Sequence, residues 1–407
     1  MREGWELKKM SDLFDVKSSK RVHKSDWKKD GIPFYRAREV VKLARNGFVD
    51  NDLFISNELY NEFTKEKGAP QEGDIIISAV GTLGQCYLVK ESDKFYFKDA
   101  SVLWFENVSN VNPTYIEYAF KSDLIMSQVM HKSMGATVGT LTISRAKIIQ
   151  IPVPPLQEQK QIVAILDKAF AAIDQAKANI EKNIENAKEL FQSKLNEIFS
   201  QKGEDWEELP IKELTTLVTK GSSPNWQGIN YVENGGIFFL TSKNVGEGKL
   251  LLANKKYLES KFNDIQKKSI LKKGDVLTNI VGASIGRTAI FDLTEITNIN
   301  QAVCLMRCIP DKISNQYLMH VLNSPYFKAI LHDNEVDNAR ANLSLTFFKN
   351  LIIPLPKIHD QKEIVAHIEH ISSETRALET TYKQKVKSLV ELKKSILQKA
   401  FAGELTN

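Results

Sequence analysis

The chain repeats the stretch Ile151-Pro152-Val153-Pro154-Pro155-Leu156-Gln157-Glu158-Gln159-Lys160-Gln161-Ile162-Val163 as Ile353-Pro354-Leu355-Pro356-Lys357-Ile358-His359-Asp360-Gln361-Lys362-Glu363-Ile364-Val365. The two copies are about 200 positions apart, which indicates a duplicated domain rather than a short solenoid repeat. In each copy the prolines exclude helix and end whatever element precedes them. The Gln/Glu/Asp cluster that follows begins a long run with helical spacing. We call this stretch the proline gate.

Other matched segments extend the repeat over both halves of the chain. Each half has a Gly-Asp turn before an aliphatic run, which predicts a buried strand, and then a glycine loop. A second strand and a short amphipathic helix follow, and a last strand leads into the gate. The matched pairs are Trp5 with Trp206, Gly73-Asp74 with Gly274-Asp275, the loops 81–84 with 282–286, the strands 100–105 with 302–306, and helix starts at Tyr115 with Tyr317.

Each half therefore reads as a mixed α/β domain of about 150 residues followed by a long helix. The predicted fold is α+β, duplicated, with the two long helices forming an antiparallel coiled coil and with pseudo-twofold architecture. We place a first globular domain at 1–154, a central helix at 155–203, a second globular domain at 204–355 and a C-terminal helix at 356–407.

The two long helices carry apolar side chains at 3–4 spacing, typical of a coiled coil. A single amphipathic rod would leave its apolar face in water, so we expect the two helices to pack on each other. Antiparallel packing is favoured over parallel packing because the first helix must carry the chain from one domain to the next through a short link. The antiparallel arrangement would also bring the two termini close together. The predicted contact positions are Leu166, Phe170, Ile173, Lys177, Ile180, Ile184, Ala187, Phe191 and Ile198, then Ile364, Ile368, Ile371, Thr375, Leu378, Tyr382, Leu389, Leu392 and Ile396.

The composition is that of a soluble globular protein, with 42% hydrophobic and 26% charged residues. No apolar run is long enough for a membrane span, and the N-terminus lacks the apolar core of a signal peptide. Three cysteines (Cys86, Cys304 and Cys308) are too few for a disulfide framework, which favours a reducing, cytoplasmic location. A net charge of +5 permits nucleic-acid binding without requiring it.

Motifs for catalysis are weak throughout the sequence. Asn112-Pro113-Thr114-Tyr115 superficially resembles an amino-methyltransferase tetrapeptide, but Asn112 also reads as a helix cap with Pro113 in the first turn. Gly246-Glu247-Gly248 reads as a turn, since it lacks a third glycine. His367 and His370, with His359 and Glu363 nearby, could bind a metal, although exposed helix histidines are the commoner explanation. We therefore predict no catalytic residues, no metal and no cofactor bound by this chain.

Basic and polar residues gather in predicted loops at matched positions of the two halves, and their identities differ between the halves. Arginine, asparagine and glutamine make bidentate contacts with base edges, while lysine and serine suit phosphates. We expect Arg36 and Arg38 to alternate on one strand face, matched by Thr241, Lys243 and Asn244. The predicted DNA-binding residues are Ser19, Lys20, Arg21, Lys24, Arg36, Arg38, Thr82, Gln85, Thr137 and Thr140 in the first half, and Lys220, Ser222, Ser223, Asn225, Thr241, Lys243, Asn244, Ser284, Arg287, Arg340 and Asn342 in the second.

In these features the sequence resembles the specificity subunits of type I restriction–modification systems, over essentially its whole length. The resemblance is carried by the gate pattern Ile-Pro-x-Pro-x-(Leu/Ile)-x-x-Gln, the Trp5 and Trp206 openings, the run Asn300-Gln301-Ala302-Val303, and the ending Leu-Lys-Lys-Ser-Ile-Leu-Gln-Lys-Ala-Phe-Ala-Gly-Glu-Leu at 392–405. One departure is Lys98-Asp99-Ala100, where the second half has Asn300-Gln301-Ala302.

The resemblance implies two target-recognition domains that each read one half of a bipartite site in double-stranded DNA. It implies that the helices act as a ruler for the unread spacer and that two methyltransferase subunits dock on the chain. Those subunits would bind S-adenosylmethionine and methylate adenine at N6, and restriction subunits would use ATP and Mg²⁺, all in bacterial defence. Two alternatives remain to be compared with this reading. The first is an adenine methyltransferase with its own recognition domain, which is disfavoured because the sequence has no cofactor-loop domain. The second is a DNA-binding or coiled-coil scaffold protein without a restriction–modification role.

Overall fold

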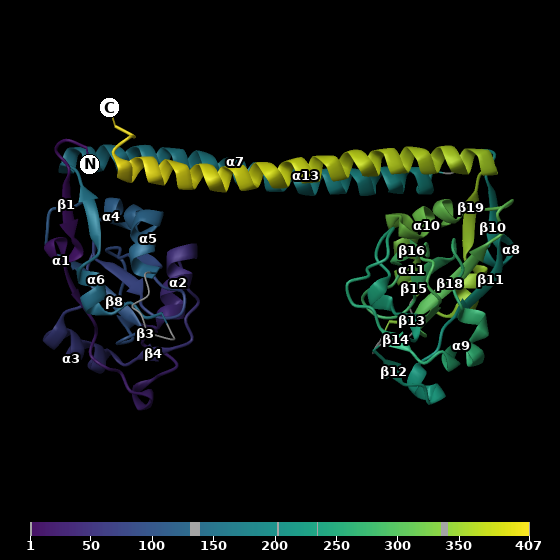
Figure 1. Ribbon diagram of the computed structural model, residues 1–407, viewed down its shortest axis with the longest axis horizontal. Helices are drawn as coiled ribbons and strands as arrows, with labels where there is room; N and C mark the ends of the chain where they lie inside the picture. Colours follow the sequence, from purple (N-terminus) through teal and green to yellow (C-terminus); the bar gives the residue numbers. More distant parts are fainter. Residues whose placement is uncertain (1, 131–138, 202, 234, 335–340, 407) are drawn as a thin grey trace. The chain divides into compact units, whose positions relative to one another are not determined.

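A computed structural model of the chain describes residues 2–130, 139–201, 203–233, 235–334 and 341–406. The contacts divide it into two units, a first unit of residues 1–180 with 384–407 and a second unit of residues 181–383. Each unit holds one globular half of the repeat and one segment of each long helix, α7 (Leu156–Ser200) and α13 (Ile358–Ala402) (Figure 1). The duplicated mixed α/β fold with paired long helices is confirmed.

The globular half of the first unit is built from three small sheets. A two-stranded ribbon pairs β1 (Glu6–Lys9) with β9 (Gln150–Val153). A four-stranded antiparallel sheet follows the order β2-β8-β5-β6, and a three-stranded sheet the order β4-β3-β7, in which β3 and β7 are parallel. Their bounds are β2 (Phe14–Lys17), β3 (Ile32–Tyr35), β4 (Phe54–Ile55), β5 (Ile75–Ser78), β6 (Cys86–Leu88), β7 (Tyr96–Phe97) and β8 (Val102–Asn107).

Six short helices complete the first unit. Those that pack next to the long helices are α4 (Pro113–Phe120) and α5 (Asp123–Met130), while α2 (Ala37–Asn46) contacts β5 and β6. The others are α1 (Met10–Leu13), α3 (Asn57–Lys67) and α6 (Ile143–Lys147), with the 3₁₀ turn η1 (Lys24–Asp26). One core cluster contains residues of β5, β8, α4 and both long helices, so the globular half and its helix segments share a hydrophobic core.

The second unit repeats this plan with its own β-ribbon, four-stranded antiparallel sheet and second sheet. The ribbon pairs β10 (Glu207–Pro210) with β19 (Ile352–Leu355), and the antiparallel sheet has the order β11-β18-β15-β16. The second sheet, β12-β14-β13-β17, has four strands instead of three. The bounds are β11 (Thr215–Lys220), β12 (Tyr231–Val232), β13 (Ile237–Leu240), β14 (Tyr257–Leu258), β15 (Val276–Asn279), β16 (Thr288–Ile290), β17 (Thr297–Ile299) and β18 (Val303–Cys308).

The helices of the second unit differ from those of the first mainly after β13. There the 3₁₀ turn η3 (Ser242–Asn244) stands where the first unit has the ten-residue helix α2. The helices are α8 (Ile211–Leu214), α9 (Lys261–Ile265), α10 (Asn315–Asn323), α11 (Pro325–Asp333) and α12 (Leu345–Asn350), with the 3₁₀ turns η2 (Pro224–Gln227) and η4 (Lys267–Ser269). The scaffold is thus shared, and its connections diverge.

Several local predictions are confirmed. The strands after the Gly-Asp turns, β5 and β15, are buried at every position. Asn112 and Ser314 cap α4 and α10, each accepting a hydrogen bond from the backbone N–H three residues later. The gate prolines behave differently from the prediction, since Pro152 and Pro354 lie inside β9 and β19. These strands each have a single partner, and an edge strand can place the missing N–H of proline away from the ladder.

The two long helices pack antiparallel, as each unit shows separately. In the first unit the buried Leu166, Phe170 and Ile173 at the start of α7 share a core with Leu397 and Phe401 at the end of α13. In the second unit the end of α7 packs with the start of α13 through a core that contains the buried residues Leu195, Phe199, Val365 and Ile368. Leu378 and Leu392, both predicted to be contact positions, are instead 47% exposed.

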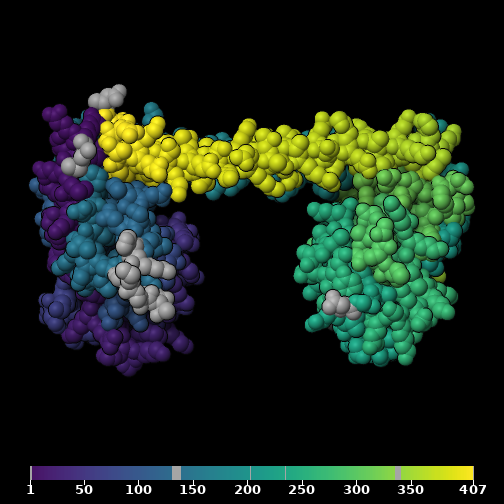
Figure 2. Space-filling view, in the orientation of Figure 1, coloured from purple at the N-terminus to yellow at the C-terminus, as the bar shows by residue number. Residues whose placement is uncertain are grey.

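The chain termini lie close together within the first unit. The Arg2 guanidinium donates hydrogen bonds to the carbonyl of Gly403 and to the hydroxyl of Thr406. Figure 2 shows the end of α13, in yellow, beside the N-terminal residues, in purple. None of the helices in the described part of the chain combines the length and apolar character that crossing a membrane requires.

Candidate DNA interface

In the second unit, three of the predicted DNA-binding segments meet around the buried side chain of Asn279. Its Nδ2 donates hydrogen bonds to the carbonyl of Ser242 (2.8 Å) and to Oγ of Ser284 (3.1 Å), which joins η3 to the glycine loop. The glycine loop also pairs with the segment before α12, through the bridge between Val281 and Asn342. Segments around 241–245, 282–287 and 341–343 therefore form one surface.

The fourth segment of the second unit joins this surface through close backbone packing. A Cβ atom at Gly221 would lie 1.7 Å from the carbonyl oxygen of Ile299, so only glycine allows the loop to approach β17. The next residue, Asn300, donates its backbone N–H to the carbonyl of Leu240, directly before Thr241. The loop that contains Lys220, Ser222, Ser223 and Asn225 is thereby linked to η3.

The first unit assembles its segments in a related way. The Ser78 hydroxyl donates to the carbonyl of Thr82 (2.5 Å) and accepts from the backbone N–H of Gln85 (3.1 Å), which shapes the glycine loop. Val80 pairs with Thr140, so the loop and the segment before α6 lie side by side. The segment 98–101 connects this group to the loop after β2, because Arg21 forms an ion pair with Asp99 (3.1 Å).

Arg36 and Arg38 do not alternate on a strand, which corrects the prediction. Strand β3 ends at Tyr35, Arg36 caps α2, and Arg38 lies in its first turn. The same holds for Thr241, Lys243 and Asn244, because β13 ends at Leu240 and η3 begins at Ser242. Alternating polar residues are typical of an extended strand and led to the prediction. In both units, however, a capping interaction between residues three apart, Arg36 with Glu39 and Thr241 with Asn244, starts a helical turn directly after the strand.

The two arginines are held by acidic partners. Arg36 and Arg38 both bond the carboxylate of Glu39, and Arg38 also bonds Asp52 (3.0 Å). Burial favours the neutral form of Glu39, yet the hydrogen bonds from the two arginines outweigh it and leave the pKa of Glu39 below its usual value. The carboxylate thus fixes the orientation of both guanidinium groups on the first unit.

Other predicted residues of the first unit are also engaged within the domain. The Ser19 hydroxyl donates to the carbonyl of Phe97 (2.7 Å). Lys20 forms ion pairs with Glu66 and Glu62 of α3, and the hydrogen bond with Glu66 raises the pKa of Lys20. Lys24 lies in η1 and is exposed. DNA phosphates would have to compete with the carboxylates for Lys20.

In the second unit the predicted residues differ in how accessible they are. Lys220, Asn225, Lys243, Arg287 and Asn342 are exposed. Asn244, in contrast, is buried, and its amide bonds Thr241 and the carbonyl of Leu251. We therefore assign Asn244 a positioning role for η3. Thr137 and Arg340 lie outside the described residues.

Three features of this surface were missed from the sequence. Trp226, next to Asn225 in η2, is 75% exposed, although tryptophan is normally expected in a core. Asn279 lies in a strand that the sequence predicts to be buried, with no sign that its side chain joins distant segments, and its Oδ1 has no hydrogen-bond partner among the described residues. Ala100 has φ of 58°, a left-handed conformation that is uncommon outside glycine. The sequence did mark the position of Ala100, because the first half has Lys98-Asp99-Ala100 where the second half has Asn300-Gln301-Ala302.

The described residues offer little that could support catalysis. Burial raises the pKa of the thiols of Cys86, Cys304 and Cys308 to about 12, so they remain protonated. Nδ1 of His359 lies 3.6 Å from Asp360 and 3.7 Å from Glu363 at the start of α13, a grouping that could hold a metal ion. All three residues are exposed, as are His367 and His370. The absence of a bound metal stays a prediction.

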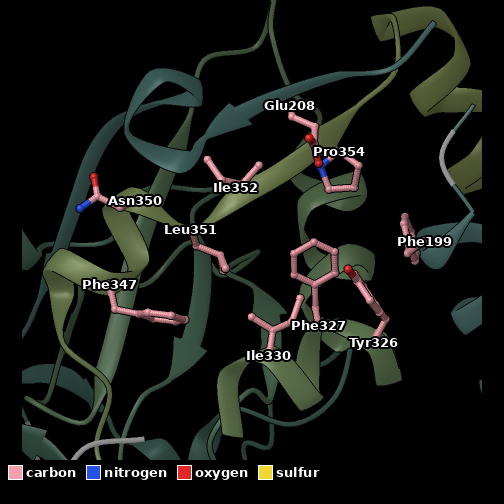
Figure 3. Close-up of a pocket in the computed structure, with 10 residues that line it drawn as sticks. All are labelled: Phe199, Glu208, Tyr326, Phe327, Ile330, Phe347, Asn350, Leu351, Ile352 and Pro354. Carbon is pink, nitrogen blue, oxygen red and sulfur yellow. The ribbon is translucent and has the colours of Figure 1, made fainter. Parts of the chain in front are cut away.

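An apolar pocket of about 360 Å³ opens on the second unit between α11, α12 and β19 (Figure 3). Its lining is mainly aromatic and aliphatic, with Tyr326 and Ile352 partly exposed at its rim. It contains none of the predicted DNA-binding residues. At the matched place in the first unit, the Gln128 amide bonds the backbone of Gln150. The pocket suits an apolar group rather than DNA.

Comparison with known proteins identifies the scaffold. The family described as type I restriction modification DNA specificity domain matches residues 2–186 and again 203–388. The specificity subunit of the type I restriction enzyme EcoBI from Escherichia coli is 26% identical, covering 100% of this chain and 87% of that protein. The MjaVIII specificity subunit from Methanocaldococcus jannaschii is 24% identical, covering 99% of this chain and 93% of that protein.

Solved structures show the same fold. The HsdS subunit from Thermoanaerobacter tengcongensis has a TM-score of 0.61 at 19% identity, covering 100% of this chain and 98% of that one. A chain from a structure of complex assembly and conformational transition in the type I R-M system has a TM-score of 0.73 at 19% identity, covering 100% and 99%. With two matches to one family model that together span most of its length, the chain belongs to the type I restriction modification DNA specificity family.

Proposed function

We propose that this chain is the DNA-specificity subunit of a type I restriction–modification enzyme, and that each globular half reads one half of a bipartite site. The observation that carries the proposal is the duplication of one scaffold with different polar residues at matched loops. The second unit presents Lys243 and Arg287 where the first presents Arg38 and Gln85. A scaffold protein without a DNA role would not require two distinct polar surfaces on a common framework.

The proposal gives the chain a recognition role without catalysis of its own. Two methyltransferase subunits would bind S-adenosylmethionine and methylate adenine, and restriction subunits would bind ATP and Mg²⁺. The long helices would dock these partners and set the length of the unread spacer. The family membership supports this assignment, and so does the name of the related EcoBI subunit.

Single-molecule methylome sequencing tests the proposal. Host cells would express this chain with its methyltransferase partner, and a matched strain would lack the chain. We expect a methylated motif of two short sequences separated by a fixed gap, which disappears when the chain is deleted. Methylation that persists without the chain would overturn the proposal and leave a DNA-binding or scaffold protein.

A further inference from the structure

A buried glutamine connects each globular half to its long helix. In the first unit Gln159, in the first turns of α7, accepts a hydrogen bond from the backbone N–H of Asn112 (2.8 Å) and donates to the carbonyl of Pro154 (2.8 Å). Its side chain is 3% exposed. Asn112 is the cap of α4, so the glutamine links a helix of the globular half to the long helix.

The second unit contains the same connection with one more hydrogen bond. Gln361, fully buried in α13, accepts from the backbone N–H of Ser314 (2.9 Å) at the start of α10. Its Nε2 donates to the carbonyls of Lys312 (3.0 Å) and Pro356 (2.9 Å). All polar atoms of the amide are engaged, which is the arrangement that makes a buried polar group rigid.

A buried tyrosine also bonds the proline gate of each unit. The Tyr115 hydroxyl donates to the carbonyl of Pro152 (2.8 Å), and the Tyr317 hydroxyl donates to the carbonyl of Pro354 (2.7 Å). The rings pack on long-helix phenylalanines, Tyr115 on Phe401 and Tyr317 on Phe199. In each unit a tyrosine and a glutamine therefore bond the carbonyls of two successive gate prolines.

We infer that Gln159 and Gln361 are positioning residues that set the angle between each recognition half and its own long helix, and thereby determine which spacer length is accepted. The inference rests on the proposed function. A loose joint would let a recognition half pivot at the proline link, and a site with a longer or shorter gap could then be bound. The bases read within each half-site would not change, because the joint contains none of the predicted DNA-binding residues.

The test uses the complete chain in complex with its methyltransferase subunits and duplexes that carry the native half-sites. The duplexes have the native gap or a gap longer or shorter by about one or two base pairs, and the dissociation constant is measured for each. We expect Gln361→Ala to reduce the preference for the native gap at least about fivefold. Gln159→Ala should have a smaller effect, because Gln159 makes one hydrogen bond fewer.

Two further variants separate positioning from loss of folding. Tyr317→Phe keeps the ring in the core and removes only the hydroxyl, and should also broaden the accepted gap. Thr215→Val removes a buried hydroxyl that donates to the carbonyl of Ile211 in the same unit, away from the joint, and should keep the native preference. Each variant is first checked for an intact complex by gel filtration.

The outcomes distinguish this inference from the proposed function. Wild-type protein that shows no preferred gap would refute the proposed function. Wild-type protein with one preferred gap, together with folded Gln361→Ala and Tyr317→Phe variants that retain the same preference, would refute the positioning role alone. A broadened gap accompanied by altered half-site bases would also refute it, because the joint would then act on base reading.

Discussion

Nζ of Lys393 on α13 lies 3.0 Å from Oδ1 of Asp174 on α7, and the same ammonium group lies 4.5 Å from the ring centre of Phe170. A residue in the last quarter of α13 thus contacts residues in the first half of α7, within the first unit. This contact agrees with the antiparallel direction that the buried residues Leu166, Phe170, Leu397 and Phe401 show in the same unit.

We expect the apolar contact, rather than the ion pair, to stabilise this helix pair. Phe170 is buried, whereas the Asp174 side chain is 62% exposed, so water screens its charge. Phe170→Ala should cost about 3–5 kcal/mol of stability, and Lys393→Ala less than about 1 kcal/mol. Calorimetric melting of both variants measures this, with Lys387→Ala as an exposed-lysine control. Equal losses for Phe170→Ala and Lys393→Ala would contradict the assignment.

His320 predicts a dependence of stability on pH. Burial, assisted by repulsion from Arg376, lowers the pKa of His320 to about 4, and its Nε2 has no hydrogen-bond partner among the described residues. Between pH of about 6.5 and 4 the unfolded chain binds a proton at this residue and the folded chain does not. The contribution of His320 to stability therefore falls as the pH falls through that range.

His320→Leu should remove this dependence. We expect the variant to melt at a similar or higher temperature than wild type at pH 7, and its advantage to grow by several degrees at pH 5. His359→Leu, at an exposed histidine on α13, is the matched control and should show no such change. An advantage that stays constant from pH 7 to pH 5 would show that His320 gains its proton over the same pH range in the folded and the unfolded protein.

The fold could be predicted from sequence because its main signals are local or repeated. The gate, the Gly-Asp turns and the caps at Asn112 and Ser314 each combine a residue type with a fixed position, and the duplication repeats each of these signals in the second half. The 3–4 spacing predicted the helix pair, although it could not show that Leu378 and Leu392 are half exposed.

The candidate site was less accessible to sequence reasoning because its organisation depends on tertiary contacts. Arg36 looked like a strand residue, and its capping role depends on the hydrogen bond between its backbone N–H and Glu39 (3.0 Å). Asn279 connects segments that are far apart in the chain, so no local pattern marks it. The exposure of Trp226 contradicts the usual preference of that residue and could be seen only in the structure.

The exposed cations of the second unit should affect DNA binding in two distinguishable ways. If Arg287 contacts a base edge, Arg287→Ala should weaken binding by about 1–3 kcal/mol and relax selectivity at that base of the second half-site alone. If Lys243 contacts a phosphate, Lys243→Ala should weaken binding to all sequences equally. The slope of the logarithm of the binding constant against the logarithm of the salt concentration should then become shallower by about one.

Binding titrations at several salt concentrations, against duplexes with each base of the half-site changed, separate these effects. Lys349→Ala, an exposed lysine of α12, is the control and should bind as wild type does. If both Arg287→Ala and Lys243→Ala bind DNA with the affinity and selectivity of the wild type, the surface around Asn279 is not part of the DNA interface.

Lengthening both long helices tests whether they measure the spacer. Inserting four residues after Ile180 and four after Lys383 adds about 6 Å to each helix and slightly more than one turn, so the apolar face is nearly preserved. Since B-DNA rises about 3.4 Å per base pair, we expect the preferred gap to grow by about two base pairs while both half-sites stay the same. Methylome sequencing of the variant measures the gap directly. Inserting one residue at the same two positions rotates the apolar face by about 100° and should abolish a defined gap. A four-residue variant that methylates the original motif would show that the spacer is fixed elsewhere in the complex.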